Sequence, residues 1–238
     1  MSSASPGKSL KVSIMEKHWI ETFKLWAETD EYHGKVKEAQ KIIKKALTRY
    51  NNPYLSYSGG KDSLVMTHLI LQEDPDIPVW HWDYGDALMP REIEKEVIDN
   101  AYKIGVKNLI IRKRRGRDAR TNHGSGYKQF FGVLNHLKKE NNWDLGFIGV
   151  RREESKKRER NYKSHFIENN CYPLLNLSWI DIWAYIVSNN LNYPSTYDKY
   201  SKVYGWDKSR FVTFFDGEFD FLGSSNVDGV LMPEFRNL

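Results

Sequence analysis

The stretch from Tyr54 to Leu71 restricts the possible folds of this chain more than any other. Residues 54–57 read as a short buried strand and residues 64–71 as an apolar helix. Between them runs Ser-Gly-Gly-Lys-Asp-Ser, here called loop 58–63. Glycines let the backbone turn tightly and let a ligand come close, and the following helix points unpaired N–H groups at that ligand. Two hydroxyls and a lysine add donors, so the loop is suited to hold phosphate, although its spacing is not that of a Walker A loop.

Further helices and strands are expected on both sides of this stretch. The pattern predicts helices at 15–27, 35–50, 91–103, 127–140 and 180–188, and strands at 77–82, 108–111 and 145–150. The first helix carries Trp19, Phe23 and Trp26 on one face, and Ser178 with Asp181 forms a capping box before the last. We expect the aromatic residues around this last helix to belong to the core or an interface: Trp179, Trp183 and Tyr185.

The net charge of +5 is concentrated in two basic segments, while the rest of the chain is net acidic. Residues 112–120 hold six basic side chains and residues 151–163 hold seven. Such segments suggest a site for a polyanion, which includes a nucleotide, a nucleic acid or an acidic partner protein. A mobile surface for the first segment and a solvated charged face for the second are the simpler alternatives.

Cysteine usage and hydropathy indicate the cellular class. Cys171 is the single cysteine, so an internal disulfide, a zinc cluster or a self-contained iron–sulfur cluster is not expected. No apolar run approaches the length of a membrane span, and the first residues lack the hydrophobic segment of a signal peptide. We therefore expect a soluble cytoplasmic protein without membrane contact, which could form a homo-oligomer. Cys171 itself should be a small core residue, because free cysteines are among the most buried residue types.

Two further segments place charged groups after predicted strands. Asp83 follows the strand at 77–82, where ligands bind in open α/β sheets, although a turn or capping aspartate is an equally good interpretation of this position alone. The segment 149–158, Gly-Val-Arg-Arg-Glu-Glu-Ser-Lys-Lys-Arg, follows the strand at 145–150. Arginine suits phosphate because its planar guanidinium donates two parallel hydrogen bonds and keeps its charge.

Loop 58–63 resembles the pyrophosphatase loop (PP-loop) of the adenine-nucleotide α-hydrolase superfamily, whose members cleave ATP between the α- and β-phosphates. Residues 77–85 look like that superfamily's second strand, whose backbone reads adenine, with Tyr84 where a threonine is usual. Segment 149–158 resembles the Gly-x-Arg-Arg-x-x-Ser-x-x-Arg motif of the sulfonucleotide (PAPS) reductases. The resemblance covers about 35–200 and implies a Rossmann-like α/β fold with a mostly parallel sheet. It divides the chain into an amino-terminal tail and helical extension (1–33), a nucleotide-binding domain (34–200) and a packed tail (201–238).

The resemblance also implies a site and its ligands. The expected nucleotide is ATP, or PAPS or APS, with Mg²⁺ held by Asp62 and Asp83 and without an iron–sulfur cluster. Lys61, Asp62, Arg151 and Arg158 are the expected catalytic residues. The nucleotide-binding residues that it implies are Ser58, Gly59, Gly60, Lys61, Asp62, Ser63, Trp82, Asp83, Gly149, Arg151, Arg152, Ser155 and Arg158.

The carboxyl-terminal tail departs from the reductases, because it lacks their cysteine nucleophile. Attack on a sulfonyl sulfur through a covalent intermediate needs a thiolate, which serine cannot replace. The preferred expectation is therefore attack on the α-phosphate of ATP with release of pyrophosphate, in sulfur or nucleic-acid modification metabolism. The alternatives are a reductase that uses Cys171 or a partner's thiol, an ATP sulfurylase-like subunit, and a non-catalytic module that binds a nucleotide or nucleic acid.

Overall fold

A computed structural model describes residues 15–85, 89–114 and 123–211 of the chain, with the backbone alone at 123–128 and 203–204. Within these residues the strands form a six-stranded sheet in the order β3-β2-β1-β4-β6-β5. All neighbours are parallel except β5 and β6. The strands are β1 (Pro53–Tyr57), β2 (Val79–Asp83), β3 (Leu109–Lys113), β4 (Leu145–Phe147), β5 (Phe166–Ile167) and β6 (Asn170–Cys171). This topology confirms the predicted mostly parallel α/β fold.

The helices agree with the predicted ones in type and differ from most of them at their ends. The helix at 91–103 has the predicted bounds, whereas the helix after loop 58–63 begins at Lys61 instead of Leu64. The described helices are α1 (Lys17–Ala27), α2 (Asp30–Arg49), α3 (Lys61–Leu71), α4 (Arg91–Lys103), α5 (His123–Glu140), η1 (Arg152–Glu154), α6 (Lys156–Asn161), α7 (Trp179–Ser188) and α8 (Thr196–Lys208). None of them has both the length and the apolar character that crossing a membrane would require.

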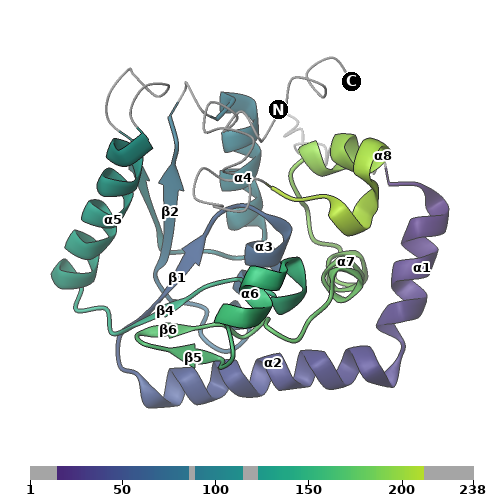
Figure 1. Ribbon diagram of the computed structural model, residues 1–238, viewed down its shortest axis with the longest axis horizontal. Helices are drawn as coiled ribbons and strands as arrows, with labels where there is room; N and C mark the ends of the chain where they lie inside the picture. The colour runs from purple at the N-terminus through teal and green to yellow at the C-terminus, as the bar shows by residue number, and fades with distance from the viewer. Residues whose placement is uncertain (1–14, 86–88, 115–122, 212–238) are drawn as a thin grey trace, which may run out of the picture.

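The central strands bury side chains on both faces of the sheet, because residues alternate in direction along a strand. Leu55, Tyr57 and Val79 belong to a cluster that also contains buried residues of α3, α4 and α7. On the opposite face, Tyr54 and Trp80 pack in a second cluster with residues of α5. Figure 1 accordingly shows α5 at the left of the strands, and α3, α4 and α7 at their right. The sheet is thus the middle layer between two groups of helices.

The two amino-terminal helices pack on the same core as the sheet. In Figure 1, α2 runs along the lower edge of the molecule and α1 along its right edge. Phe23 of α1 is fully buried against aromatic residues of α7, as the predicted aromatic face requires. The predicted divisions at 33/34 and 200/201 fall inside α2 and α8, and the segments 1–14 and 212–238 lie outside the described residues.

The strand order reverses at β1. From β1 the chain proceeds outward to β2 and β3, then returns to place β4 on the other side of β1. In an open α/β sheet such a reversal leaves a crevice beyond the carboxyl ends of the two strands, where ligands bind. Loop 58–63 follows β1 and segment 149–158 follows β4, so the topology brings the two predicted phosphate-binding segments to one crevice.

Candidate functional site

Loop 58–63 is held in shape by its own hydroxyls and by a glycine with a left-handed backbone. Gly59 has φ of +80°, and a Cβ there would come within 2.5 Å of Val97 Cγ1. The hydroxyl of Ser63 donates to the Gly60 carbonyl at 2.9 Å and accepts from the amide of Ser58 at 3.3 Å. Both the conformation and the close packing against α4 therefore require glycine at position 59.

Segment 149–158 lies directly against this loop. A Cβ on Gly149 would be 3.2 Å from the carbonyl carbon of Asp62 and from the amide nitrogen of Ser63. The atoms that such a Cβ would meet belong to the backbone, which cannot move aside as a flexible side chain can. The first glycine of the predicted arginine motif thus serves close approach of two backbones across the β1–β4 reversal.

Lys61 points into the domain, where it is 1% exposed. Its Nζ donates to the Ser209 carbonyl at 2.9 Å, lies 3.3 Å from a carboxylate oxygen of Asp62, and lies over the ring of Tyr197. Burial lowers the pKa of Lys61, and the nearby Asp62 carboxylate opposes that shift. The backbone amide of Lys61 donates to the Tyr197 hydroxyl at 2.9 Å, so α8 and the residues after it cover the start of α3.

Asp62 forms an ion pair with Arg151, whose side chain is also almost fully buried. Burial alone would raise the pKa of Asp62, but the charges of Arg151 and Lys61 outweigh burial and hold that pKa below its usual range. Asp62 therefore stays ionised at neutral pH. Arg151 also donates to Glu153 at 2.9 Å, so it ties the loop after β1 to the segment after β4.

These two segments enclose a small cavity of about 100 Å³, here called the polar pocket. A third segment, residues 209–211, follows α8, and its Arg210 and Phe211 line this pocket. Three charged residues of the lining contact one another in this pocket. Glu154 accepts hydrogen bonds from Arg158 and Arg210, and its Oε1 lies 2.9 Å from Arg210 Nη2. The lining residues are Ser58, Gly60, Lys61, Asp62, Ser63, Gly149, Glu154, Arg158, Tyr197, Arg210 and Phe211.

The structure brings some predicted site residues together and places others elsewhere. Arg152 does not line the polar pocket: it donates to the carbonyls of Tyr162 at 2.8 Å and Lys163 at 3.2 Å, and to the side chain of Asn176. Ser155 caps α6 by accepting from the Arg158 amide at 3.0 Å, so it orients the helix that carries Arg158. Direct contact of Arg152 or Ser155 with a nucleotide remains a prediction.

Asp83 lies at the end of β2 and is engaged by Arg91. The guanidinium nitrogens of Arg91 lie 2.9 and 3.0 Å from the two carboxylate oxygens, and the Gly85 amide donates to the same group at 2.7 Å. Burial would raise the pKa of Asp83, but these hydrogen bonds lower it. Within the described ranges no three His, Cys, Asp or Glu side chains gather as a metal site. The expected Mg²⁺ site at Asp62 and Asp83 therefore stays a prediction.

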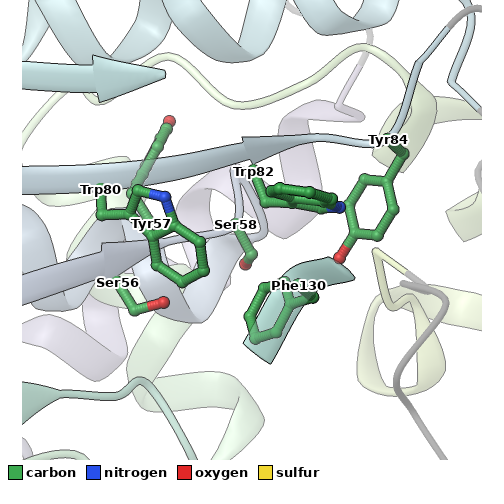
Figure 2. A pocket seen from close by; sticks show the side chains of 7 residues that line it. All are labelled: Ser56, Tyr57, Ser58, Trp80, Trp82, Tyr84 and Phe130. Atoms are coloured by element: carbon green, nitrogen blue, oxygen red, sulfur yellow. The ribbon is translucent and has the colours of Figure 1, made fainter. Parts of the chain in front are cut away.

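A second cavity of about 170 Å³ lies between the ends of β1 and β2 and helix α5. Figure 2 shows Trp80, Trp82 and Tyr84 on one side of it and Phe130 of α5 on the other. The rings of Trp80 and Phe130 have centroids 4.8 Å apart, and Trp82 meets Phe130 edge-on at 5.8 Å. We call this the aromatic cavity. Ser58 lines it and also lines the polar pocket, so the two cavities meet at the first residue of loop 58–63.

Cys171 lies in β6 and is completely buried, as predicted for a core residue. Burial raises the pKa of its thiol to about 12, so it carries almost no thiolate at neutral pH. It is not among the residues that line either cavity. Trp183 and Tyr185 are likewise buried in the core.

Sequence reasoning assigned no site role to Glu154, Tyr197, Arg210 or Phe211. Tyr197 and Ser209 meet Lys61 across 136 and 148 residues of sequence, and no local pattern reports contacts over such separations. Glu154 lies inside segment 149–158, between Arg152 and Ser155, and this position in the motif was the sequence signal for its place at the site.

A glycine loop between a parallel strand and a helix, at a reversal of strand order, defines an α/β domain of the nucleotide-binding class. The chain belongs to the family of phosphoadenosine phosphosulfate reductase domains, whose family model matches residues 52–223, and thereby to the PP-loop superfamily. The predicted resemblance of the chain to this group is thus confirmed, and the matched range includes loop 58–63 and segment 149–158.

Curated relatives carry a different name within the same superfamily. The chain is 27% identical over 195 residues to sulfate adenylyltransferase subunit 2 of Mycolicibacterium vanbaalenii, covering 67% of this chain and 62% of that protein. The corresponding protein of Mycobacterium tuberculosis is 28% identical over 201 residues, with the same coverage. This chain therefore spans less than two thirds of the length of these relatives.

Two solved structures are similar at low sequence identity. Phosphoadenylyl-sulfate reductase from Candida auris has 16% identity and a TM-score of 0.48, covering 82% of this chain and 92% of that one. NMN synthetase from Francisella tularensis has 10% identity and a TM-score of 0.49, covering 68% and 71%.

Proposed function

We propose that this protein binds ATP in the two adjoining cavities and catalyses attack on its α-phosphate, with release of pyrophosphate. The observation that carries the proposal is the polar pocket, where loop 58–63 and segment 149–158 converge at the strand-order reversal. Its three cationic side chains, Lys61, Arg158 and Arg210, suit the β- and γ-phosphates. The adjoining aromatic cavity offers apolar ring surfaces of the kind on which a purine base stacks.

Four charged residues take part in the proposed reaction, namely Lys61, Asp62, Arg151 and Arg158. Lys61 and Arg158 offset the negative charge that develops on the pyrophosphate leaving group as the bond to the α-phosphate breaks. Arg151 does not line the pocket and acts by holding Asp62 in place. Asp62 stays ionised and lines the pocket, so it suits a Mg²⁺ that enters with ATP. Proteins hold such a Mg²⁺ through one or two carboxylates together with the phosphates of the nucleotide.

For the acceptor we propose sulfate. The relatives in Mycolicibacterium and Mycobacterium are named sulfate adenylyltransferase subunit 2, and a sulfate oxygen attacking the α-phosphate would yield adenylyl sulfate and pyrophosphate. The word subunit in that name supports a further proposal, that a partner protein contributes to the complete enzyme.

Reduction of PAPS or APS is the second candidate, favoured by the family to which the chain belongs. It would need a thiolate at the site, yet Cys171 is buried in β6 with a pKa near 12. Reduction by this chain would therefore depend on a thiol from another protein.

The test is an assay for pyrophosphate and adenylyl sulfate from ATP, Mg²⁺ and sulfate, with and without the candidate partner subunit. We expect sulfate-dependent release of pyrophosphate that Lys61→Ala abolishes and Cys171→Ser leaves nearly intact. A parallel assay should detect no sulfite from PAPS or APS with thioredoxin. Sulfite release that disappears in Cys171→Ser would overturn the proposal and establish a reductase.

A further inference from the structure

The segment after α8 adds a second arginine to the polar pocket, beside Arg158. Arg210 lines the pocket, and its position is fixed because its neighbour Ser209 is bound on two sides. The Ser209 carbonyl accepts from Lys61 Nζ at 2.9 Å, and its hydroxyl donates to the Gly205 carbonyl at 2.7 Å. The cation of loop 58–63 and the backbone of this segment therefore hold each other in place, with Arg210 facing the loop.

Glu154 lies between Arg210 and Arg158, the last arginine of segment 149–158. One carboxylate oxygen accepts from Arg210 at 2.9 Å, and the other accepts from Arg158 and from the Arg151 amide at 3.1 Å. The Glu154 side chain is only 7% exposed. A carboxylate and a phosphate or sulfate group accept hydrogen bonds from guanidinium groups in the same paired geometry. Glu154 thus holds the place of an oxyanion between Arg158 and Arg210.

We infer that Glu154 is an internal competitor of the substrate oxyanion, and that Arg210 is a ligand which the oxyanion takes over from it. The inference rests on the proposed function for the identity of the oxyanion, a phosphate of ATP or the sulfate acceptor. On entry of the oxyanion, Arg158 and Arg210 exchange the carboxylate for phosphate or sulfate oxygens. The Arg151 amide remains as a donor that keeps Glu154 nearby.

Glu154 explains two properties of the pocket: two arginines can lie close together in the absence of substrate, and weakly charged anions bind poorly. Two guanidinium groups facing each other repel, and Glu154 removes that repulsion. A weakly charged anion gains little by displacing a carboxylate, whereas a pyrophosphate group with several negative charges gains more. Glu154 therefore lowers affinity for all anions and favours the most highly charged ones.

The experiment measures binding of inorganic pyrophosphate by calorimetry to the wild type and three variants. Arg210→Ala removes charge-assisted hydrogen bonds and should weaken binding at least about tenfold. Glu154→Gln keeps the shape and an acceptor oxygen while removing the charge, and should tighten binding several-fold. Arg160→Ala is the matched control, because Arg160 is an exposed arginine on the same helix as Arg158, and should change affinity by less than twofold. Circular dichroism of each variant verifies folding.

Different results overturn different statements. If Glu154→Gln weakens pyrophosphate binding, Glu154 positions the arginines and does not compete, and the inference fails. If Arg210→Ala binds like the wild type, Arg210 is no ligand. Should the expected series appear while no pyrophosphate is released from ATP, the inference stands and the proposed catalysis fails. Repeating the titration with sodium sulfate assigns the site: a gain in Glu154→Gln for sulfate alone places the acceptor there, and a gain for pyrophosphate places the leaving group.

Discussion

Lys61 and Asp62 are neighbours in sequence, yet they connect the loop to different parts of the chain. Lys61 binds the carbonyl of Ser209 beyond α8, whereas Asp62 pairs with Arg151 beyond β4. Both residues line the polar pocket. The two charged side chains of loop 58–63 that line the pocket therefore also fasten the loop to the rest of the domain.

Asp62→Asn should reduce both stability and metal-dependent nucleotide binding. The substitution leaves Arg151 buried without its counter-charge, a change that typically destabilises by about 3 kcal/mol. Urea unfolding at pH 7 measures the loss. Because the pKa of Asp62 is lowered by folding, its contribution is complete above the ordinary carboxyl pKa and disappears only as the pH falls through the lowered value. The difference between wild type and variant should accordingly be constant from pH 7 to pH 5; a difference already vanishing at pH 6 would contradict the assignment.

Gly149→Ala should weaken nucleotide binding more than it weakens the fold. Its Cβ would press on the backbone of Asp62 and Ser63 and push the two pocket segments apart. Calorimetry with ATP–Mg²⁺ should show at least a tenfold loss of affinity. Gly34→Ala is the control: nothing lies within 4 Å of a Cβ there, and alanine in the exposed interior of α2 should stabilise by about 0.5–1 kcal/mol. Equal ATP affinity in both variants would show that the Gly149 contact does not shape the site.

At the scale of the elements, α7 joins the amino-terminal helices to the domain through one carboxylate. Asp181 accepts from its own cap residue Ser178 at 2.7 Å, from Trp26 of α1 at 2.7 Å, and from Lys35 of α2 at 3.1 Å. Burial would raise the pKa of Asp181, but these donors lower it. The capping box was predicted from sequence, whereas the two longer contacts were not.

Asp181→Ala should therefore destabilise the protein far more than a substitution that removes the helix cap alone. It leaves the Trp26 indole N–H and the Lys35 ammonium without their buried acceptor, so we expect a loss of about 3 kcal/mol. Ser178→Ala removes the cap alone and should cost about 1 kcal/mol. Thermal and urea unfolding of the pair compare the two values. Similar losses in both variants would mean that Asp181 acts only as a cap.

The elements themselves could largely be predicted, and the reason is local. Apolar periodicity places α4 at its observed bounds, and it places α3 within three residues of its observed start. Strand β4 was predicted to run to Val150 but ends at Phe147, which is the last residue of β4 that pairs with β1 and β6. The site was predictable where its residues form a local motif, as in loop 58–63. Tyr197 and Arg210 could not be predicted, because they reach the loop only through the tertiary fold.

For the whole molecule, the structure changes how the basic segments are interpreted. Of the segment 151–163, Arg151, Arg152 and Arg158 all bond within the domain. Most of the segment 112–120 lies outside the described residues. The exposed basic side chains of 151–163 are Lys156, Lys157, Arg160 and Lys163. This arrangement favours a single nucleotide over a nucleic acid as the polyanion.

We accordingly expect weak binding to oligonucleotides with a shallow dependence on salt. A surface that neutralised six phosphates would lose roughly a thousandfold in affinity between 50 and 200 mM salt, with a log–log slope near −0.9 per phosphate. Gel-shift and anisotropy titrations across that range measure the slope. Tight binding with a steep slope would identify the protein as a nucleic-acid-modifying enzyme.

The reversal of strand order at β1 also governs when the site can exist during synthesis. Loop 58–63 is made early, but its partner Arg151 follows 89 residues later and Ser209 a further 58 residues on. A ribosome-bound chain that ends before β4 would hold the glycine loop without the arginine that fastens it, and contacts across such separations form slowly. The pocket is built from segments made at three different times, so it cannot be complete before the segment after α8 has been made. Nucleotide binding by a nascent chain would report that these three segments have come together.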